Sequence, residues 1–408
     1  MISDNLYVWV HLPNATEPTI AGYLEITTTA AGKVGRFNYG QTYLRVPNAI
    51  PIDPVALPLK KGVETFTSLN GFPGVILDAS PDAWGKRVID RLKGQQANHI
   101  GYLLLNDPGR TGALSFSKQA NETPAPLQSL EFDLATLMSA AEAVEANQPV
   151  DSALLKALHP GSGGARPKCN IIEQDATWIA KFPSIDDRFI NIPRLEHATM
   201  MLARTCGIDA AATQIRQING KDICLVQRFD RQHQQGQITR RSFISARTVF
   251  YDDPSYAALA TGSYQRLSRW IPRFGATIND KQQLFRRLVF NVVVRNDDDH
   301  ELNHGLVHLQ RDKYALAPAY DIVPNLQIRP VNHHALLIGA SSAGTVANLI
   351  SIAEDFALSQ AEALLIVRDI EEQVLSTWQD IFYEAGFGDE DIRKIAPIFR
   401  PIPTGEDL

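Results

Sequence analysis

The order of hydrophobic and polar positions predicts a β-rich start to the chain. In roughly the first 100 residues, short apolar and aromatic runs, among them residues 7–11 and 21–26, are separated by Pro, Asn and Gly. Such runs are typical of strands joined by turns. A helix is then expected to begin with Ser80 as its N-cap and Pro81 in its first turn, with Trp84 on its apolar face.

A polar stretch that contains two prolines, residues 118–126, predicts a domain boundary. We therefore expect an N-terminal domain over residues 1–125 and a second body over residues 126–408. Within that body strands give way to helices. We expect one lobe over residues 126–230 and a mainly helical lobe over residues 231–408.

The second body begins with a glycine-rich turn and then combines short strands with helices. Strands are predicted at residues 169–172, 177–181 and 222–226, and helices at residues 193–206 and 282–294. Apolar residues of the later helix recur every three or four positions, which indicates a single buried stripe.

Composition excludes several classes of protein. The 408 residues are too many for one compact core, so we expect two or three units. Hydrophobic residues make up 44% and charged residues 21%, which excludes a disordered, collagen-like or coiled-coil chain. The 39 basic residues are outnumbered by 45 acidic ones. This balance disfavours a protein that grips nucleic acid by itself, but it leaves room for a local basic patch.

Cysteine spacing and hydropathy point to one compartment. The three cysteines lack C-x-x-C spacing, which argues against a disulfide framework or a zinc site and suits a reducing cytosol. Residues 1–10 lack the basic and apolar segments of a signal peptide. Polar residues interrupt the least polar stretch, residues 335–353. We therefore expect a cytoplasmic protein that neither spans nor binds a membrane.

The glycine-rich turn is a candidate phosphate-binding loop. Phosphoryl transfer from ATP requires a flexible loop over the phosphates, a lysine, metal ligands and a carboxylate near the attacking hydroxyl. Gly161, Gly163 and Gly164 allow close backbone approach, and Arg166 and Lys168 add positive charge. An ordinary turn between strands would show the same glycines, so the loop alone is a weak sign.

Lys181 is the candidate lysine, because it ends an apolar strand after the glycine-rich turn. A lysine in that position can also simply extend its charge into water. Glu196 on the following helix could pair with Lys181, or it could be a surface glutamate in a first helical turn.

The clearest sign of chemistry is the segment Arg-Asn-Asp-Asp-Asp-His-Glu-Leu-Asn at residues 295–303. A kinase catalytic loop separates its base from its metal-binding asparagine by four residues, and only Asp298 has that spacing to Asn303. Asp321 follows an apolar strand and could ligate Mg²⁺ or cap the next turn. Together the three residues favour a phosphotransferase.

The histidines of this region leave two alternatives open. His300 could hold the loop by hydrogen bonds, which we prefer, or contact a nucleotide phosphate. A zinc site built from His304, His308 and residues 333–334 is the second alternative, but neither H-E-x-x-H nor paired cysteines support it.

Four segments, in the order of one known family, carry a resemblance. They are residues 78–91 with Asp-Ala-Ser-Pro-Asp-Ala-Trp-Gly, residues 163–168 with Gly-Gly-Ala-Arg-Pro-Lys, residues 228–231 with Arg-Phe-Asp-Arg, and residues 296–303 followed by 320–322. On these segments the chain resembles the HipA family, the serine/threonine kinase toxins of bacterial toxin–antitoxin modules. The resemblance implies an α+β fold: a protein-kinase-like two-lobed body with an N-terminal β-rich subdomain and a mainly helical C-terminal lobe.

The resemblance also implies ATP and Mg²⁺ as cofactors. Asp298 matches the family's catalytic base, Lys181 its ATP lysine, and Asn303 and Asp321 its Mg²⁺ ligands. The implied nucleotide-binding residues are Gly163, Gly164, Ala165, Arg166, Pro167, Lys168, Lys181, Gln227, Arg228, Phe229, His300, Asn303, Tyr320 and Asp321. Gln227 stands where a glutamate is frequent in the family.

Partners are implied in the same way. Better-known members phosphorylate aminoacyl-tRNA synthetases and are restrained by a small helix-turn-helix antitoxin. We expect such a protein substrate or another translation factor, a helix-turn-helix antitoxin, and DNA contacted only indirectly through the antitoxin. Members also silence themselves by phosphorylating a serine before the glycine loop, and here Ser162 is the nearby serine.

Two other functions remain open. A small-molecule phosphotransferase of the aminoglycoside or choline kinase kind would share the order of carboxylate, asparagine and carboxylate, but the Trp84 segment speaks against it. A non-catalytic co-repressor that acts through an antitoxin is disfavoured by the complete set of Lys181, Asp298, Asn303 and Asp321.

Overall fold

The computed structural model describes residues 2–106, 108–125, 132–158, 164–187, 189–253 and 262–405. The chain forms two compact units, each assembled from separate segments. Unit 1 comprises Met1–Ile185, Gln227–Thr248 and Val307–Tyr314, and unit 2 comprises Asp186–Val226, Val249–Leu306 and Ala315–Leu408. The boundaries expected at residues 125/126 and 230/231 stay predictions.

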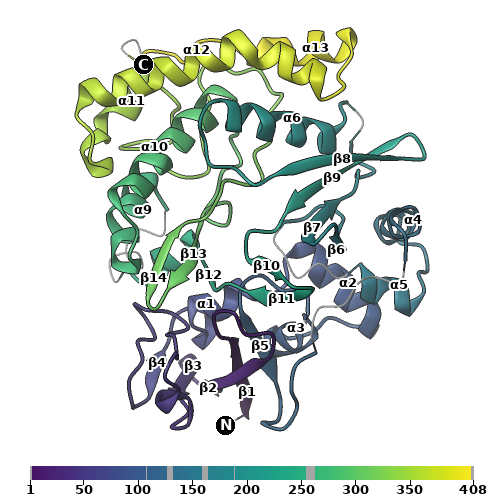
Figure 1. Cartoon of the computed structure of the whole chain (residues 1–408), viewed down its shortest axis with the longest axis vertical. Helices are drawn as coiled ribbons and strands as arrows, with labels where there is room; N and C mark the ends of the chain where they lie inside the picture. Colours follow the sequence, from purple (N-terminus) through teal and green to yellow (C-terminus); the bar gives the residue numbers. More distant parts are fainter. Residues whose placement is uncertain are drawn as a thin grey trace. The chain divides into compact units, whose positions relative to one another are not determined.

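Unit 1 begins with an antiparallel sheet, which confirms the predicted β-rich start (Figure 1). Its strands are β1 (Ile2–His11), β2 (Pro18–Thr29), β3 (Gly32–Tyr39), β4 (Glu64–Phe66) and β5 (Leu114–Ser117), in the order β4-β3-β2-β1-β5. Leu6, Val8 and Val10 alternate along β1 and have no exposed surface. This period of two is what places one face of a strand in a core.

Three helices follow the sheet in sequence: α1 (Gly74–Asp78), α2 (Ala83–Lys93) and α3 (His99–Leu105). The helix predicted near residue 80 is α2, but the prediction that Ser80 is its N-cap is wrong. The N-cap is Asp82, whose carboxylate accepts the amide hydrogen of Gly85 at 2.6 Å. A carboxylate is as good a cap as a hydroxyl, and it also complements the positive end of the helix. Trp84 is 1% exposed and belongs to the buried face, as predicted.

The other helices and strands of unit 1 stand before and after the candidate phosphate-binding loop in sequence. They are α4 (Leu134–Glu145), α5 (Ser152–Ala157), β6 (Lys168–Glu173), β7 (Ala176–Lys181), β10 (Arg231–Gln234), β11 (Gln237–Arg240) and β12 (Phe243–Ser245). Strands β6 and β7 form an antiparallel hairpin in which Lys168 is the partner of Lys181. The strands predicted at 169–172 and 177–181 are thus confirmed.

Unit 2 is mainly helical. Its helices are α6 (Ile192–Thr205), α9 (Tyr264–Trp270), α10 (Ile278–Val293), α11 (Val346–Ser351), α12 (Gln360–Glu384) and α13 (Asp389–Ile395). Strands β8 (Thr213–Ile218) and β9 (Lys221–Gln227) form a hairpin. The predicted helices at 193–206 and 282–294 are confirmed as α6 and α10, and the strand at 222–226 as β9.

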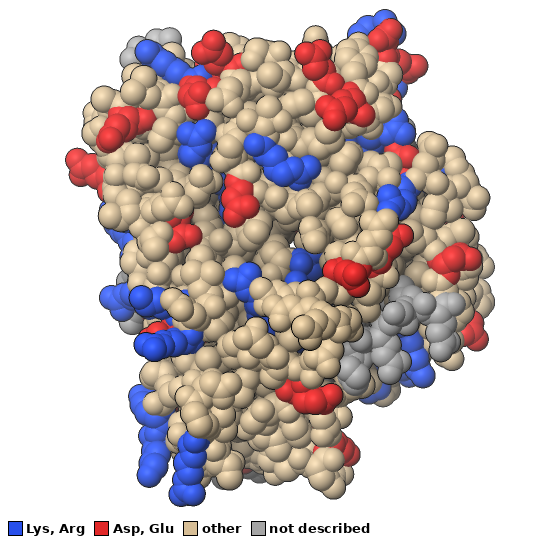
Figure 2. Space-filling model, viewed as in Figure 1, with Lys and Arg blue, Asp and Glu red and all other residues tan. Residues whose placement is uncertain are grey.

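Four elements contain a boundary between the two units in sequence: β9, whose last residue Gln227 belongs to unit 1, α7 (Ala246–Tyr251), β13 (Gly305–Gln310) and β14 (Lys313–Leu316). Within the described ranges, every helix is too short or too polar to span a bilayer. On the face shown in Figure 2, basic and acidic side chains are interspersed, so that face carries no single continuous basic surface.

Candidate functional site

The loop after α10 separates its three consecutive aspartates into three environments. Asp299 is 2% exposed, and its carboxylate accepts hydrogen bonds from the hydroxyl of Tyr264 and from Nε2 of His304, the latter at 2.9 Å. The His304 ring also packs edge-on against Tyr264. Asp299 therefore anchors the loop to α9 and has no room for a substrate.

The other two aspartates differ in exposure. Asp297 is half-buried, and Nδ2 of Asn325 donates to its Oδ2 at 3.1 Å. Burial raises the pKa of Asp297, although the Asn325 hydrogen bond and the charges of Arg329 and Arg295 act in the opposite direction. Asp298 is exposed, and its carboxylate makes no hydrogen bond or ion pair with any described residue. Of the three, Asp298 is the one whose side chain is exposed to solvent.

The segment that carries Asp321 runs beside this loop. Three hydrogen bonds join the two segments: Ala317 N to Gly305 O at 2.9 Å, Tyr320 Oη to Leu302 O at 2.7 Å, and Asn325 N to Arg295 O at 2.8 Å. Asp321 lies between two of these attachment points. The structure thus brings Asp321 into the neighbourhood of Asp298 and Asn303, within unit 2.

Two backbone features shape this neighbourhood. Arg295 and Asp321 both have left-handed backbone conformations, with φ of 59° each. Non-glycine residues seldom adopt this region, and such residues are frequent at functional sites. In both places the chain turns sharply, once after α10 and once after the segment that follows β14.

Asn303 and Asp321 fit a partly hydrated Mg²⁺. Asn303 is 7% exposed, and its Nδ2 donates to the backbone oxygen of Asp298 at 3.1 Å, which leaves the amide oxygen of Asn303 for another partner. An amide oxygen and a carboxylate are hard oxygen ligands, and Mg²⁺ in nucleotide sites takes few protein ligands because the phosphates and water supply the rest. Among the described residues, no group of three or more His, Cys, Asp or Glu side chains is placed to hold a metal ion.

Two further predicted residues hold the loop. Nδ1 of His300 accepts the amide hydrogen of Leu302 at 3.2 Å, as preferred in the sequence analysis. The hydroxyl of Tyr320 donates to the carbonyl of Leu302. A contact of either side chain with a nucleotide stays a prediction.

In unit 1, the indole of Trp84 bridges Leu158 and Lys168, the residues on either side of the glycine-rich loop, which we call the loop neck. Its Nε1 lies 2.9 Å from the carbonyl oxygen of Lys168, which follows the loop, and 3.3 Å from that of Leu158, which precedes it. The backbone N–H of Trp84 also donates to Gly164 O at 3.4 Å. One buried side chain of α2 thus connects both ends of the loop.

The N-cap of α2 adds a second connection. Nζ of Lys168 lies 3.0 Å from Oδ2 of Asp82, and the two side chains are 3% and 7% exposed. Burial raises the pKa of the Asp82 carboxyl, while the Lys168 ammonium and the Gly85 amide oppose that shift. Gly164, with φ of 112°, lies against this pair, because a Cβ there would come within 2.5 Å of Nζ of Lys168.

The Arg228 segment is held by a buried ionic cluster. Arg228 and Arg231 both pair with Asp230, at 2.8 and 2.9 Å. Arg228 also donates to the carbonyls of Gly109 and Arg110 and to Oδ1 of Asn170. The Arg228 side chain is therefore occupied within unit 1, and a role beside adenine would fall to its backbone. Gln227 is exposed and Phe229 is half-buried.

The remaining predicted residues divide between the two units. Lys181 is the last residue of β7 and belongs to unit 1, as do Ala165, Arg166 and Pro167 of the loop. The carbonyl of Pro167 accepts the amide hydrogen of Phe182 at 2.9 Å. Glu196 is 3% exposed in α6, so it is not a surface glutamate. Its pairing with Lys181 stays a prediction. Ser162 and Gly163 lie outside the described residues.

Two groups of residues are not predicted to support the site from the sequence. Asp82 and Trp84 belong in the sequence to a capped helix and a family motif, and that motif is the signal that could reveal the loop neck. Tyr264, which supports Asp299, lies far away in sequence and left no signal of its own.

Comparison with known proteins adds to this geometry. A family model described as the HipA-like C-terminal domain matches residues 161–378. Putative kinase Y4dM of Sinorhizobium fredii is 26% identical over 223 residues, which are 50% of this chain and 52% of that protein. A putative kinase of Haemophilus influenzae is 23% identical over 165 residues, 37% of this chain and 46% of that protein. The chain spans about half the length of these curated relatives.

A solved structure matches nearly the whole chain. A chain of the Shewanella oneidensis MR-1 complex of HipA, HipB and operator DNA has a TM-score of 0.69 and 16% sequence identity, and the match covers 97% of this chain and 96% of that chain. This likeness confirms the expected fold class, a mixed α+β chain with a protein-kinase-like body.

Proposed function

The chain belongs to the HipA-like family, and on that basis we propose that it is an ATP-dependent serine/threonine protein kinase that transfers the γ-phosphoryl group to a protein hydroxyl. One observation carries the proposal. Of three adjacent aspartates, the structure buries one, half-buries another and leaves Asp298 exposed, next to Asn303 and the Asp321 segment. Asp298 is also the residue with the base-to-asparagine spacing of a kinase loop.

Each residue has a separate role in this proposal. Lys181 binds the phosphates, and Asn303 and Asp321 hold Mg²⁺, which when bound neutralises charge that develops on the transferred group. Asp298 orients the substrate hydroxyl and accepts its proton. Anchoring of Asp299 by Tyr264 keeps the loop in place, so that the Asp298 carboxylate is positioned before the substrate arrives.

The loop neck serves the same reaction. Trp84 fastens Lys168 and Leu158, which flank the glycine-rich segment in sequence, to α2. A loop with a fixed neck loses less conformational entropy when it closes over phosphates. Trp84 and Asp82 are therefore positioning residues that act through the loop.

We assign the protein to the toxin side of a toxin–antitoxin module. The support is family membership together with the fold of a protein solved with HipB and operator DNA. A small helix-turn-helix antitoxin would be its partner, and DNA would be contacted only through that partner. The substrate class is a translation protein such as an aminoacyl-tRNA synthetase. Phosphorylation of Ser162 by the protein itself belongs to the same proposal.

Transfer of labelled phosphate separates this function from its rivals. The protein is incubated with γ-labelled ATP and Mg²⁺, once with lysate proteins and once with aminoglycosides and choline. Label in discrete proteins is the expected result. Label in the small alcohols alone would identify a small-molecule phosphotransferase, and no Mg²⁺-dependent ATP binding by calorimetry would indicate a non-catalytic co-repressor.

A further inference from the structure

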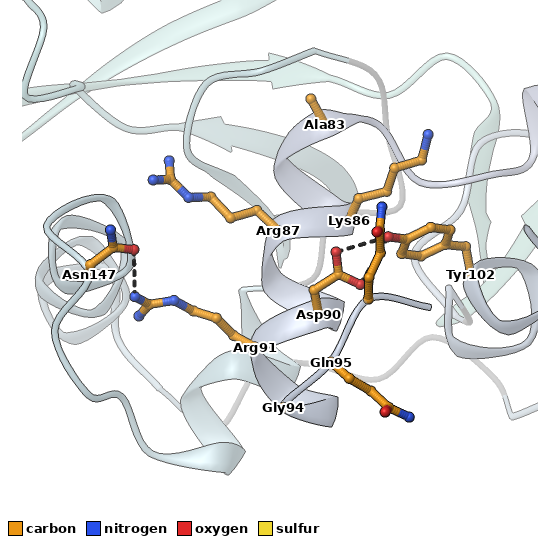
Figure 3. A pocket seen from close by; sticks show the side chains of 10 residues that line it. Ala83, Lys86, Arg87, Asp90, Arg91, Gly94, Gln95, Tyr102 and Asn147 are labelled. Carbon is orange, nitrogen blue, oxygen red and sulfur yellow. Dashed lines mark hydrogen bonds between the residues drawn. The ribbon is translucent and has the colours of Figure 1, made fainter. Parts of the chain in front are cut away.

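A basic pocket in unit 1 is lined by none of the residues assigned to phosphoryl transfer or to the loop neck. Its volume is about 760 Å³, and its walls come from α2, the turn that follows α2, Tyr102 of α3 and Asn147 (Figure 3). It is an open depression of the surface with room for a small molecule, so a ligand bound there would stay partly exposed to solvent. Three of its lining residues, Lys86, Arg87 and Arg91, are cations of a single helix.

Arg87 and Arg91 are one helical turn apart and extend toward the side on which Asn147 lies (Figure 3). Like charges at this spacing on a helix repel each other. Arg87 is exposed, and its guanidinium has no hydrogen bond or ion pair within the described part of the chain. An anion between the two guanidinium groups would replace this repulsion by attraction to both.

Arg91 is already held in place for such an anion. Its Nη1 donates to the carbonyl of Gln148 at 2.7 Å, and its Nη2 donates to Oδ1 of Asn147 at 2.9 Å. A side chain fixed in this way loses little freedom when a ligand binds.

The one carboxylate among the lining residues offsets only part of this positive charge. Oδ1 of Asp90 accepts hydrogen bonds from Tyr102 and from the amide of Ala97, both at 2.9 Å, and Oδ2 accepts from Tyr102 at 2.8 Å. Lys86 lies on that side of α2, with Nζ 5.6 Å from the centre of the Tyr102 ring. Asp90 is the single acidic residue among the lining side chains, so the pocket keeps an excess of positive charge.

We propose that this pocket binds a small molecule through a phosphoryl or pyrophosphoryl group. Planar guanidinium groups bind phosphate oxygens in pairs, and the excess of positive charge matches a dianion better than a single carboxylate. Only ten residues line the pocket, which suits a small molecule better than a length of polymer.

Calorimetric titration of the full-length protein with inorganic pyrophosphate tests the site. The titration is run at fixed ionic strength and without divalent cations, so that Mg²⁺-dependent nucleotide binding does not contribute. We expect the Arg87→Gln substitution to weaken pyrophosphate binding at least tenfold. The matched control is Lys93→Gln, which removes one positive charge from the exposed end of the same helix, outside the pocket, and should change binding less than twofold.

Other outcomes would overturn the proposal. These are no measurable pyrophosphate binding by the unsubstituted protein, unchanged binding by Arg87→Gln, or an equal loss in Lys93→Gln, which would indicate general charge attraction. Loss of binding in Lys181→Ala but not in Arg87→Gln would assign the pyrophosphate to the proposed nucleotide site instead. Citrate, titrated in parallel, distinguishes a phosphate site from a site for any polyanion, and equal binding of citrate would also contradict the proposal. Labelled phosphate transfer is measured separately, so failure of this site leaves the proposed kinase activity standing.

Discussion

At the scale of single residues, the roles of Trp84 and of the buried Asp230 can be checked by substitution. Trp84 closes the loop neck through one N–H group shared between two carbonyls. Asp230 forms ion pairs with both Arg228 and Arg231 of the Arg-Phe-Asp-Arg motif. Neither residue touches a substrate in the proposed reaction, so each should act through position or stability.

The Trp84→Phe substitution should raise KM for ATP about threefold to tenfold and leave kcat nearly unchanged. A hydrogen bond is worth about 1 kcal/mol, and its loss lets the loop neck open. Steady-state kinetics with a protein substrate measure the effect. The matched control is Trp9→Phe in the β1 strand, which also loses an indole hydrogen bond, to Ser117. Equal changes of KM in both variants would mean that Trp84 matters only for folding.

The Asp230→Asn substitution should lower the free energy of unfolding by about 3–5 kcal/mol at pH 7, because it leaves two buried guanidinium groups without their counter-charge. Burial alone would raise the pKa of Asp230, but Arg228 and Arg231 outweigh it and hold the pKa well below its usual range. A carboxylate with a lowered pKa in the folded state stabilises the fold above its unfolded pKa, about 3.9, and this contribution is lost as the pH falls below that value.

Urea unfolding from pH 7 down to pH 3 checks the sign. The difference between the unsubstituted protein and Asp230→Asn should be constant above about pH 5 and should shrink below about pH 4, by up to ~1.4 kcal/mol per pH unit. A difference that grows at low pH would be incompatible with a paired, ionised Asp230.

At the scale of elements, α10 and α2 are the helices that present the proposed site residues. Helix α10 ends where the aspartate loop begins, and its start is fixed by a capping box in which Thr277 and Asp280 exchange side-chain and backbone hydrogen bonds. Helix α2 turns its N-terminus toward the glycine-rich loop neck and lines the basic pocket with cations of a later turn.

The Thr277→Ala substitution should lower the free energy of unfolding by about 1 kcal/mol, the usual cost of losing an N-cap. Phosphate transfer should persist, because Asp299 anchors the loop at the other end of α10. Ser359→Ala, which removes the equivalent cap from α12, is the control and should cost about as much. A loss of activity in Thr277→Ala without a loss of stability would show that the cap controls the loop directly.

How much of these elements could be predicted from the sequence depends on how local their causes are. Neighbouring residues determine helix α10 and the hairpin strands β6 and β7, so these elements could be predicted. The spacing from Asp298 to Asn303 is read directly from the sequence. The N-cap of α2 was misplaced because Ser80 and Asp82 are both good caps, and only the three-dimensional path decides between them. The Trp84 neck and the Tyr264–Asp299 hydrogen bond join distant segments, so no local pattern could show them.

At the scale of the whole molecule, the proposed reaction needs residues that are far apart in the sequence to act on one nucleotide. Lys181 ends β7, whereas Asn303 and Asp321 come after α10. If all of them bind one Mg²⁺–ATP, the effects of substituting them cannot be independent, because each contact depends on a nucleotide that the others hold.

A double-mutant cycle tests this requirement. The affinity for Mg²⁺–ATP is measured by calorimetry for the unsubstituted protein, for Lys181→Ala, for Asp321→Asn and for the double variant. We expect a coupling energy of about 0.5–3 kcal/mol between the two substitutions. Strictly additive effects would place the two residues at separate sites. Without Mg²⁺, the Asp321→Asn substitution should lose most of its effect, since its role is to hold the metal.

The most direct test of the central claim is labelled phosphate transfer by Asp298→Asn beside Glu301→Gln. Both substitutions neutralise one carboxylate of the same loop, but only Asp298 is proposed to accept the proton of the substrate hydroxyl. We expect Asp298→Asn to lower transfer to proteins by about 1000-fold or more while Mg²⁺–ATP binding persists, and Glu301→Gln to retain transfer within a few-fold. Near-normal transfer by Asp298→Asn, with Mg²⁺–ATP still bound, would contradict the account.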